Sequence, residues 1–203
     1  MNKLDFNKIM IERLSGFEEK PRLLLHSCCA PCSSHCLSVL APLAKVSVLY
    51  FNPNIYPCEE YEKRKSEQKR LIESVFPEAE LLDADYDHDA FLRAAAGLEG
   101  EREGGARCEK CFRLRLERAA REAKAGGFDL FATTLTVSPH KNAPLINAIG
   151  LEEGEKAGVE FLPSDFKKRD GYLHSVRLSE KYALYRQNYC GCEFSLDIDN
   201  KKL

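Results

Sequence analysis

The sequence predicts an α/β protein built on a parallel sheet of about five strands, with helices on both faces. Short apolar, β-branched or aromatic runs alternate five times with longer helical patterns. This alternation is typical of a parallel sheet, because each helix returns the chain to start the next strand in the same direction. We expect a single α/β domain over residues 1–203, with an N-terminal helix in 1–20 and an extension over 164–203.

The expected strands are short, and helical patterns separate them. The strands are residues 23–25, 45–51, 79–84, 128–134 and 159–162. The helical patterns cover residues 4–19, 36–40, 59–76, 90–97, 112–125, 143–157 and 175–185. Gly16 and Pro21 end the first helix, and Gly126-Gly127 ends the helix before the fourth strand.

Composition sets limits on the class of protein. Of the 203 residues, 44% are hydrophobic and 31% are charged, as in ordinary globular domains. A formal net charge of -2 excludes a generally basic nucleic-acid binder but leaves room for a local basic patch. No apolar run approaches the length of about 18 residues typical of a membrane span. We therefore expect a cytoplasmic protein with no membrane partner.

Four thiols follow the first strand within nine positions, at Cys28, Cys29, Cys32 and Cys36. A strand, a turn and a helix start place the first three where open α/β sheets bind ligands, at the carboxyl end of a strand. Backbone N–H groups and the helix dipole favour thiolates there. Cys36 lies one helical turn further along an apolar run, so we expect it to pack in the core.

Two further cysteine pairs are closely spaced: Cys108 and Cys111 form C-x-x-C, and Cys190 and Cys192 form C-x-C. In a reducing compartment such pairs indicate metal or redox chemistry rather than structural disulfides. A thioredoxin-type dithiol would explain C-x-x-C alone. A structural zinc site or one iron–sulfur cluster uses four thiolates, so six or seven thiols could hold a cluster and one further metal.

Other polar residues follow the strands. The acidic run from Asp83 to Asp89 is either a solvated loop with a helix cap or the source of a metal-binding carboxylate. We expect the histidines to be hydrogen-bonded core residues rather than ligands; they are His26, His35 and His140. Three further residues could either line the pocket or belong to an ordinary turn or helix surface, and the sequence favours neither role. They are Asn52, Tyr61 and Arg64.

Five motifs in chain order resemble the QueH family of epoxyqueuosine reductases. They are His26-Ser27-Cys28-Cys29-Ala30-Pro31-Cys32; Tyr50-Phe51-Asn52-Pro53-Asn54-Ile55; Arg107-Cys108-x-x-Cys111-Phe112-x-Leu114-Arg115-Leu116; Thr133-Thr134-Leu135 with Ser138-Pro139; and Tyr185-Arg186-Gln187-x-Tyr189-Cys190-Gly191-Cys192. The resemblance runs from about Leu23 to Cys192. It implies a Rossmann-like sheet of the adenine nucleotide alpha hydrolase-like kind.

The resemblance also implies a reaction and its cofactors: reduction of epoxyqueuosine to queuosine at the wobble position of tRNA, with a 4Fe-4S cluster and an additional mononuclear iron. The implied thiol ligands are Cys28, Cys29, Cys108, Cys111, Cys190 and Cys192. The carboxylate ligand of the additional iron would be Asp83, Asp85 or Asp87, with Asp87 preferred, and the role of Cys32 stays open. The implied partners are a tRNA with a GUN anticodon and an electron donor such as ferredoxin or flavodoxin.

The reaction needs protons as well as electrons, and Tyr86, Tyr189 or metal-bound water could donate them. Basic residues near the expected ligands predict a ring of charge for RNA phosphates, unless they form an ordinary solvated face. They are Arg113, Arg115, Lys167, Lys168, Arg169, Arg177 and Arg186. Two other functions compete: an iron–sulfur tRNA sulfurtransferase, which needs a glycine-rich loop for ATP, and a non-catalytic zinc-binding module.

Overall fold

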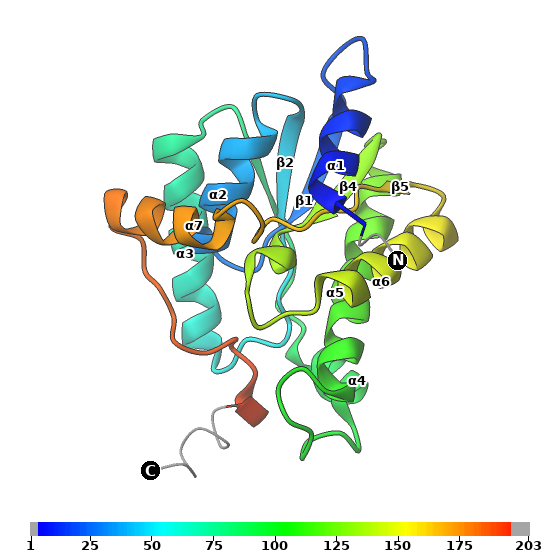
Figure 1. Cartoon of the computed structure of the whole chain (residues 1–203). Coiled ribbons are helices and arrows are strands. Elements are labelled where there is room, and N and C mark those ends of the chain that lie inside the picture. The colour runs from blue at the N-terminus through cyan, green and yellow to red at the C-terminus, as the bar shows by residue number, and fades with distance from the viewer. Residues whose placement is uncertain (1–3, 196–203) are drawn as a thin grey trace.

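The computed structural model describes residues 4–195, so residues 196–203 of the expected C-terminal extension lie outside the described residues. Five strands form one sheet in the order β3-β2-β1-β4-β5, and every neighbouring pair is parallel (Figure 1). The strands are β1 (Arg22–His26), β2 (Lys45–Tyr50), β3 (Glu80–Asp83), β4 (Leu130–Thr133) and β5 (Glu160–Phe161). The predicted α/β fold and all five predicted strands are confirmed.

Helices join the strands and cover both faces of the sheet. They are α1 (Phe6–Ser15), α2 (Ala30–Leu40), α3 (Cys58–Val75), α4 (His88–Ala95), α5 (Ala106–Ala125), α6 (Ala143–Ala157) and α7 (Gly171–Lys181), with a short 3-10 turn η1 (Thr134–Val137). Among the described helices, none is both long and apolar enough to cross a membrane.

Several helix boundaries differ from the prediction, and those of three helices bear on where the cysteines lie. The helix α2 begins at Ala30, six residues earlier than expected, because Pro31 suits a first helical turn although the apolar pattern starts only at Cys36. The helix α5 begins at Ala106, so the C-x-x-C pair lies within the helix rather than before it. The helix α7 covers 171–181 instead of 175–185. The first turns of α2 and α5 hold mainly polar or small residues that apolar periodicity does not mark, whereas the first turn of α7 exposes its large hydrophobic residues, Tyr172 and Leu173.

Alternate side chains of the central strand point to opposite faces of the sheet. Leu23 and Leu25 pack with residues of α1, α2 and α3, whereas Leu24 packs with residues of α5 and α6. Cys36 is fully buried in the first of these clusters, as predicted. Both faces are thus closed by helices, and the carboxyl edge of the sheet stays available for polar side chains.

His26 ties three strand exits together in the core. Its neutral ring donates from Nε2 to the Phe51 carbonyl at 3.0 Å and accepts at Nδ1 from the Thr133 hydroxyl at 2.9 Å. Burial, with the nearby positive charge of Arg115, lowers the pKa of His26 to about 4. The prediction of a satisfied core histidine is confirmed for His26, but it is wrong for His140, which is exposed on the loop after β4.

A second histidine contact joins α2 to α7. His35 on α2 is buried, and its Nδ1 lies 2.9 Å from Nδ1 of His174 on α7. The first residue of α7 must be glycine, because a Cβ on Gly171 would lie 1.8 Å from the Phe166 carbonyl oxygen and 2.5 Å from Nε2 of His35. This close approach sets where α7 begins against α2.

Acidification should loosen the α2–α7 contact. Burial, with the neighbouring His174, lowers the pKa of His35 to about 4 in the folded protein, against about 6.5 when unfolded. Between these values the unfolded chain binds more protons, so stability falls as the pH falls. From pH 7 to pH 5 His35 should contribute a loss of about 1–2 kcal/mol, measured by urea unfolding. The total loss of unfolding free energy between pH 7 and pH 5 should be smaller by this amount in His35→Gln and unchanged in His140→Gln. Equal losses in the two variants would show that His35 is not the group responsible.

Candidate metal centre

Thiols from three distant parts of the chain line one cavity. They are Cys28 from the turn after β1, Cys108 and Cys111 from α5, and Cys190 and Cys192 from the segment after α7. The interior space is about 50 Å³, which is more than a single water molecule needs. Thiols from all three parts of the chain therefore border one space, and five of the six predicted thiol ligands meet there.

The sixth predicted thiol belongs to a tight group beside the cavity. The Sγ atoms of Cys28, Cys29 and Cys32 all lie within 4.8 Å of one another, and Sγ of Cys28 is 3.8 Å from Sγ of Cys29. Cys29 is the residue before α2, and Cys32 lies in the first turn of that helix. The structure therefore places Cys32, whose role the sequence left open, with the other two. Three thiols at this spacing could hold a metal ion.

Two of the thiols have lowered pKa values, which favours their thiolate forms. The pKa of Cys28 is well below the ordinary value because the thiols of Cys29 and Cys32 donate hydrogen bonds to it, and so does the Thr134 hydroxyl at 3.3 Å. The pKa of Cys190 is also well below that value, because the Cys192 thiol donates to it and the Cys192 backbone N–H does so at 3.4 Å. Thiolate is the form that binds metals, so the cavity offers one ready ligand from each end of the chain.

Positive side chains share the cavity with the thiols; they are Arg64, Arg107, Arg115 and Lys141. Burial opposes the charged form of Lys141, but the thiolates of Cys28 and Cys190 raise its pKa overall. Sequence reasoning missed Arg107 and Lys141. The available signals were the position of Arg107 beside Cys108 and that of Lys141 in the polar exit of β4. These cations favour an anionic occupant.

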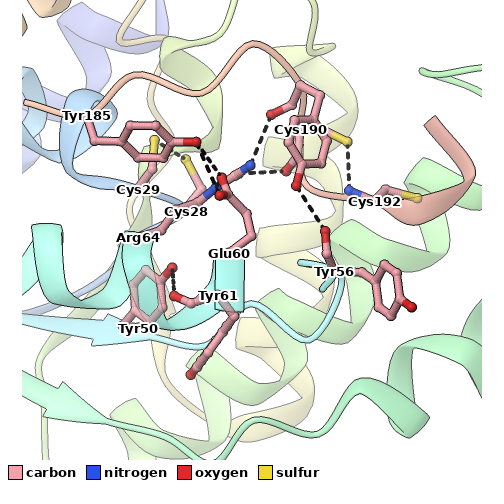
Figure 2. A network of polar contacts seen from close by, with 11 residues as sticks. Cys28, Cys29, Tyr50, Tyr56, Glu60, Tyr61, Arg64, Tyr185, Cys190 and Cys192 are labelled. Carbon is pink, nitrogen blue, oxygen red and sulfur yellow. Dashed lines mark hydrogen bonds and ion pairs between the residues drawn. The ribbon is translucent and has the colours of Figure 1, made fainter. Parts of the chain in front are cut away.

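One side of α3 binds the C-terminal segment, which we define as residues 182–192 (Figure 2). In Figure 1 this segment, in orange, leaves α7 and runs beside α3. Arg70 donates to the carbonyls of Tyr182 and Ala183, both at 3.1 Å. Glu67 accepts the Tyr185 backbone N–H at 2.6 Å. These α3 residues are one helical turn apart, so a single stripe of the helix guides the segment toward the cavity.

Arg64 continues the same stripe at the cavity itself. Its side chain is 2% exposed and pairs with Glu60 at 2.7 Å. The other guanidinium nitrogens donate to the carbonyls of Cys190 at 3.3 Å and Tyr189 at 3.5 Å. Glu60 in turn accepts from the Tyr185 hydroxyl at 3.1 Å (Figure 2). A buried ion pair thus fixes the backbone that carries the C-x-C thiols.

Gly191 lets the C-x-C turn approach this ion pair closely. Its φ of +104° is in the left-handed region, and a Cβ there would lie 2.8 Å from the Ile55 side chain and 3.1 Å from Nη1 of Arg64. The Gly191 carbonyl accepts the Tyr56 N–H at 2.9 Å. The Tyr189 hydroxyl donates to the Tyr56 carbonyl at 2.9 Å. The loop after β2 therefore holds the turn together with Arg64.

The other predicted site residues lie around the cavity rather than in its wall. The Tyr86 hydroxyl donates to the Ile55 carbonyl at 2.6 Å. Asp87 caps α4, accepts the Ala90 N–H at 2.9 Å and is exposed, one turn before the cavity residue Phe91. Asn52 and Tyr61 are buried, and their side chains donate to backbone carbonyls. The metal role of Asp87 and the catalytic roles of Tyr86 and Tyr189 stay predictions.

The predicted basic ring is wrong for most of its members. Arg113 forms ion pairs at 2.7 Å with Glu152 and Glu153 of α6. Lys168 and Arg169 line a separate hollow beside the start of α1. Of the seven residues, Arg115 alone lines the thiol cavity, where it is buried. Proximity in sequence to a ligand did not place these charges at the cavity, because α5 and the loop after β5 turn them toward other partners.

The fold and the cavity define an α/β protein with a thiol-rich, metal-competent centre at the carboxyl edge of a parallel sheet. A family model described as epoxyqueuosine reductase QueH matches residues 23–197. Curated relatives named epoxyqueuosine reductase QueH include one from Streptococcus pyogenes, 39% identical over 95% of this chain and 78% of its own length. A relative from Staphylococcus epidermidis is 39% identical over 95% of this chain and 85% of its own length. A relative from Thermotoga maritima is 37% identical over 86% of this chain and 90% of its own length. The chain therefore belongs to the epoxyqueuosine reductase QueH family.

Removing the Arg64 guanidinium should release the C-terminal segment. Arg64→Met leaves the Glu60 carboxylate with the Tyr185 hydroxyl but no cation, and removes the guanidinium donor from two carbonyls, at a cost of about 1.5–3 kcal/mol in unfolding free energy. Hydrogen exchange of the metal-free protein should show faster exchange in residues 182–192. Lys69→Met is the control, because Lys69 lies on the same helix in an exposed pair with Glu73. Equal exchange in both variants would show that the segment does not depend on Arg64.

Proposed function

We propose that this chain reduces epoxyqueuosine in tRNA to queuosine, in the cytoplasm and with an iron–sulfur cluster and an adjacent iron. The observation that carries the proposal is the meeting of thiols from three chain segments in one cation-lined cavity. Membership of the QueH family supports the same activity. The substrate would be a tRNA with a GUN anticodon, and a donor such as ferredoxin or flavodoxin would deliver electrons one at a time.

The side chains of the cavity fit this metal content. Soft thiolates are the usual ligands of iron–sulfur clusters. The proposed thiol ligands are Cys28, Cys29, Cys108, Cys111, Cys190 and Cys192, with Asp87 as a further ligand to the additional iron. The surrounding cations offset the negative charge that several thiolates bring into a buried site. When bound, the metals would supply single electrons and an electrophile for the epoxide oxygen.

The proposed reaction breaks two C–O bonds and forms a C=C bond, and it consumes two electrons and two protons as the oxygen leaves as water. Tyr86 and Tyr189 are the proposed proton donors. Both hydroxyls donate to carbonyls of adjacent residues, Ile55 and Tyr56, in the loop after β2. Burial raises the pKa of Tyr86 to about 12 and also raises that of Tyr189. Both phenols therefore hold their protons at neutral pH.

Loss of either distant thiol pair should remove the metal. The protein purified without oxygen should be brown, and Cys108→Ala or Cys190→Ala should strip most of the iron and the colour. Cys58→Ala is the control, because Cys58 is exposed and outside the cavity wall. Iron analysis and visible spectra test this directly. Full iron and colour in both cavity variants would refute a shared site.

Conversion of epoxyqueuosine to queuosine in isolated tRNA, followed by nucleoside mass spectrometry, tests the activity itself. A colourless protein that contains zinc would instead indicate a binding module. A brown protein that consumes ATP and transfers sulfur would indicate a sulfurtransferase. The turn after β1 reads His-Ser-Cys-Cys-Ala-Pro-Cys over residues 26–32, without the glycine-rich phosphate loop that an ATP-dependent enzyme of this fold needs.

The carboxylate ligand has its own test. Asp87→Asn should remove roughly one iron per chain and the reductase activity while the cluster spectrum persists, because the amide is a poor ligand for iron. Asp89→Asn, two residues further along α4, is the control. If Asp87→Asn keeps the iron content and activity of the unsubstituted protein, Asp87 is not the ligand and another carboxylate has to be.

A further inference from the structure

Arg107 lies at the start of α5, directly before Cys108, and is 1% exposed. One of its terminal nitrogens, Nη1, donates to the carbonyls of Leu98 at 3.1 Å and Glu99 at 2.8 Å, and also to that of Glu101. These bonds anchor the loop before α5. The guanidinium also forms part of the cavity wall, together with the thiols.

The remaining two nitrogens of the same group are unpaired. Nε and Nη2 of Arg107 are buried and have no hydrogen-bond partner within residues 4–195. The Phe194 ring lies 5.4 Å from Cζ and contacts the cation as a π system. Buried guanidinium N–H groups are costly to leave without an acceptor, so their position in a cavity wall calls for one.

The cavity restricts the chemistry of that acceptor. Its walls carry five cysteines, four cations and a single carboxylate, that of Glu103. Two of these thiols are close to Arg107. Cys108 is the next residue in the sequence, and Cys192 packs in one cluster with Phe194, whose ring contacts the Arg107 guanidinium. The excess of cations over carboxylates in the wall favours an anionic acceptor, and the cysteines favour one that fits among sulfur atoms. Sulfur atoms of an iron–sulfur cluster, or of the thiolates that bind it, meet both conditions.

We propose that Nε and Nη2 of Arg107 donate hydrogen bonds to sulfur atoms of a cluster bound in this cavity and thereby raise its reduction potential. The inference rests on the proposed function, because it assumes that the cavity holds a cluster. One-electron reduction adds negative charge to the cluster, and N–H donors stabilise the more negative state more strongly. Arginine suits this role because its planar group anchors the loop with one nitrogen and presents two others.

The test is the midpoint potential of the cluster, measured by anaerobic titration with dithionite and electron paramagnetic resonance. Arg107→Met removes all the donors, and Arg107→Lys keeps a charge without the planar group. Both should bind as much iron as the unsubstituted protein and show a more negative potential, with the larger shift in Arg107→Met. Arg121→Met is the control, since Arg121 is an exposed residue of the same helix. A potential equal to that of the control in both variants would overturn the proposal.

A second measurement avoids the loss of the loop anchor. Pulsed electron paramagnetic resonance of the reduced protein labelled with ¹⁵N-arginine should show coupling to an arginine nitrogen, weaker in Arg107→Lys and unchanged in Arg121→Lys. No coupling in the unsubstituted protein would also overturn the proposal. If that protein binds no cluster, both this inference and the proposed function fail. A cluster with shifted potentials but no conversion of epoxyqueuosine would refute the proposed function alone.

Discussion

The candidate site depends on one buried ion pair, that between Arg64 and Glu60 of α3. A parallel sheet brings the exits of its strands to one edge without further help, and this accounts for Cys28 after β1. It does not account for Cys190 and Cys192, which follow the last strand by about thirty residues. The ion pair supplies the missing constraint, because its remaining donors bind the backbone of that segment.

A charge in this position is costly to bury, and the structure offsets the cost with several partners. Arg64 meets a carboxylate, two carbonyls and the face of the Tyr189 ring, with Cζ 4.9 Å from its centroid. A hydrophobic side chain of similar volume could fill the same space, but it could not fix the register of a strand-free segment. Gly191 adds to this specificity. Any other amino acid at this position would place a Cβ against the guanidinium, and glycine lets the backbone approach it closely.

Most of the fold, and the meeting of the thiols, follow from sequence patterns. Alternating apolar runs and helical periodicity mark all five strands, and closely spaced cysteines mark the cavity. The sequence patterns do not show which residues each charged side chain contacts in the folded protein. Arg107 and Arg113 are both arginines of α5 near the same C-x-x-C pair, yet one is buried in the cavity wall and the other pairs with glutamates of α6. Only packing between elements distant in sequence separates the two.

The electrostatics of the cavity couple its two ends. The pKa values of Cys28 and Cys190 are both lowered, which favours thiolates, and the negative charge of each raises the pKa of Lys141. Two negative charges in one buried space repel, so nearby cations are needed to offset the repulsion. Those cations lie on α3, α5 and the loop after η1, whereas Cys190 lies on the C-terminal segment. The body of the domain therefore supplies the positive charge of the cavity, and the C-terminal segment supplies the second of the two thiols that favour the thiolate form.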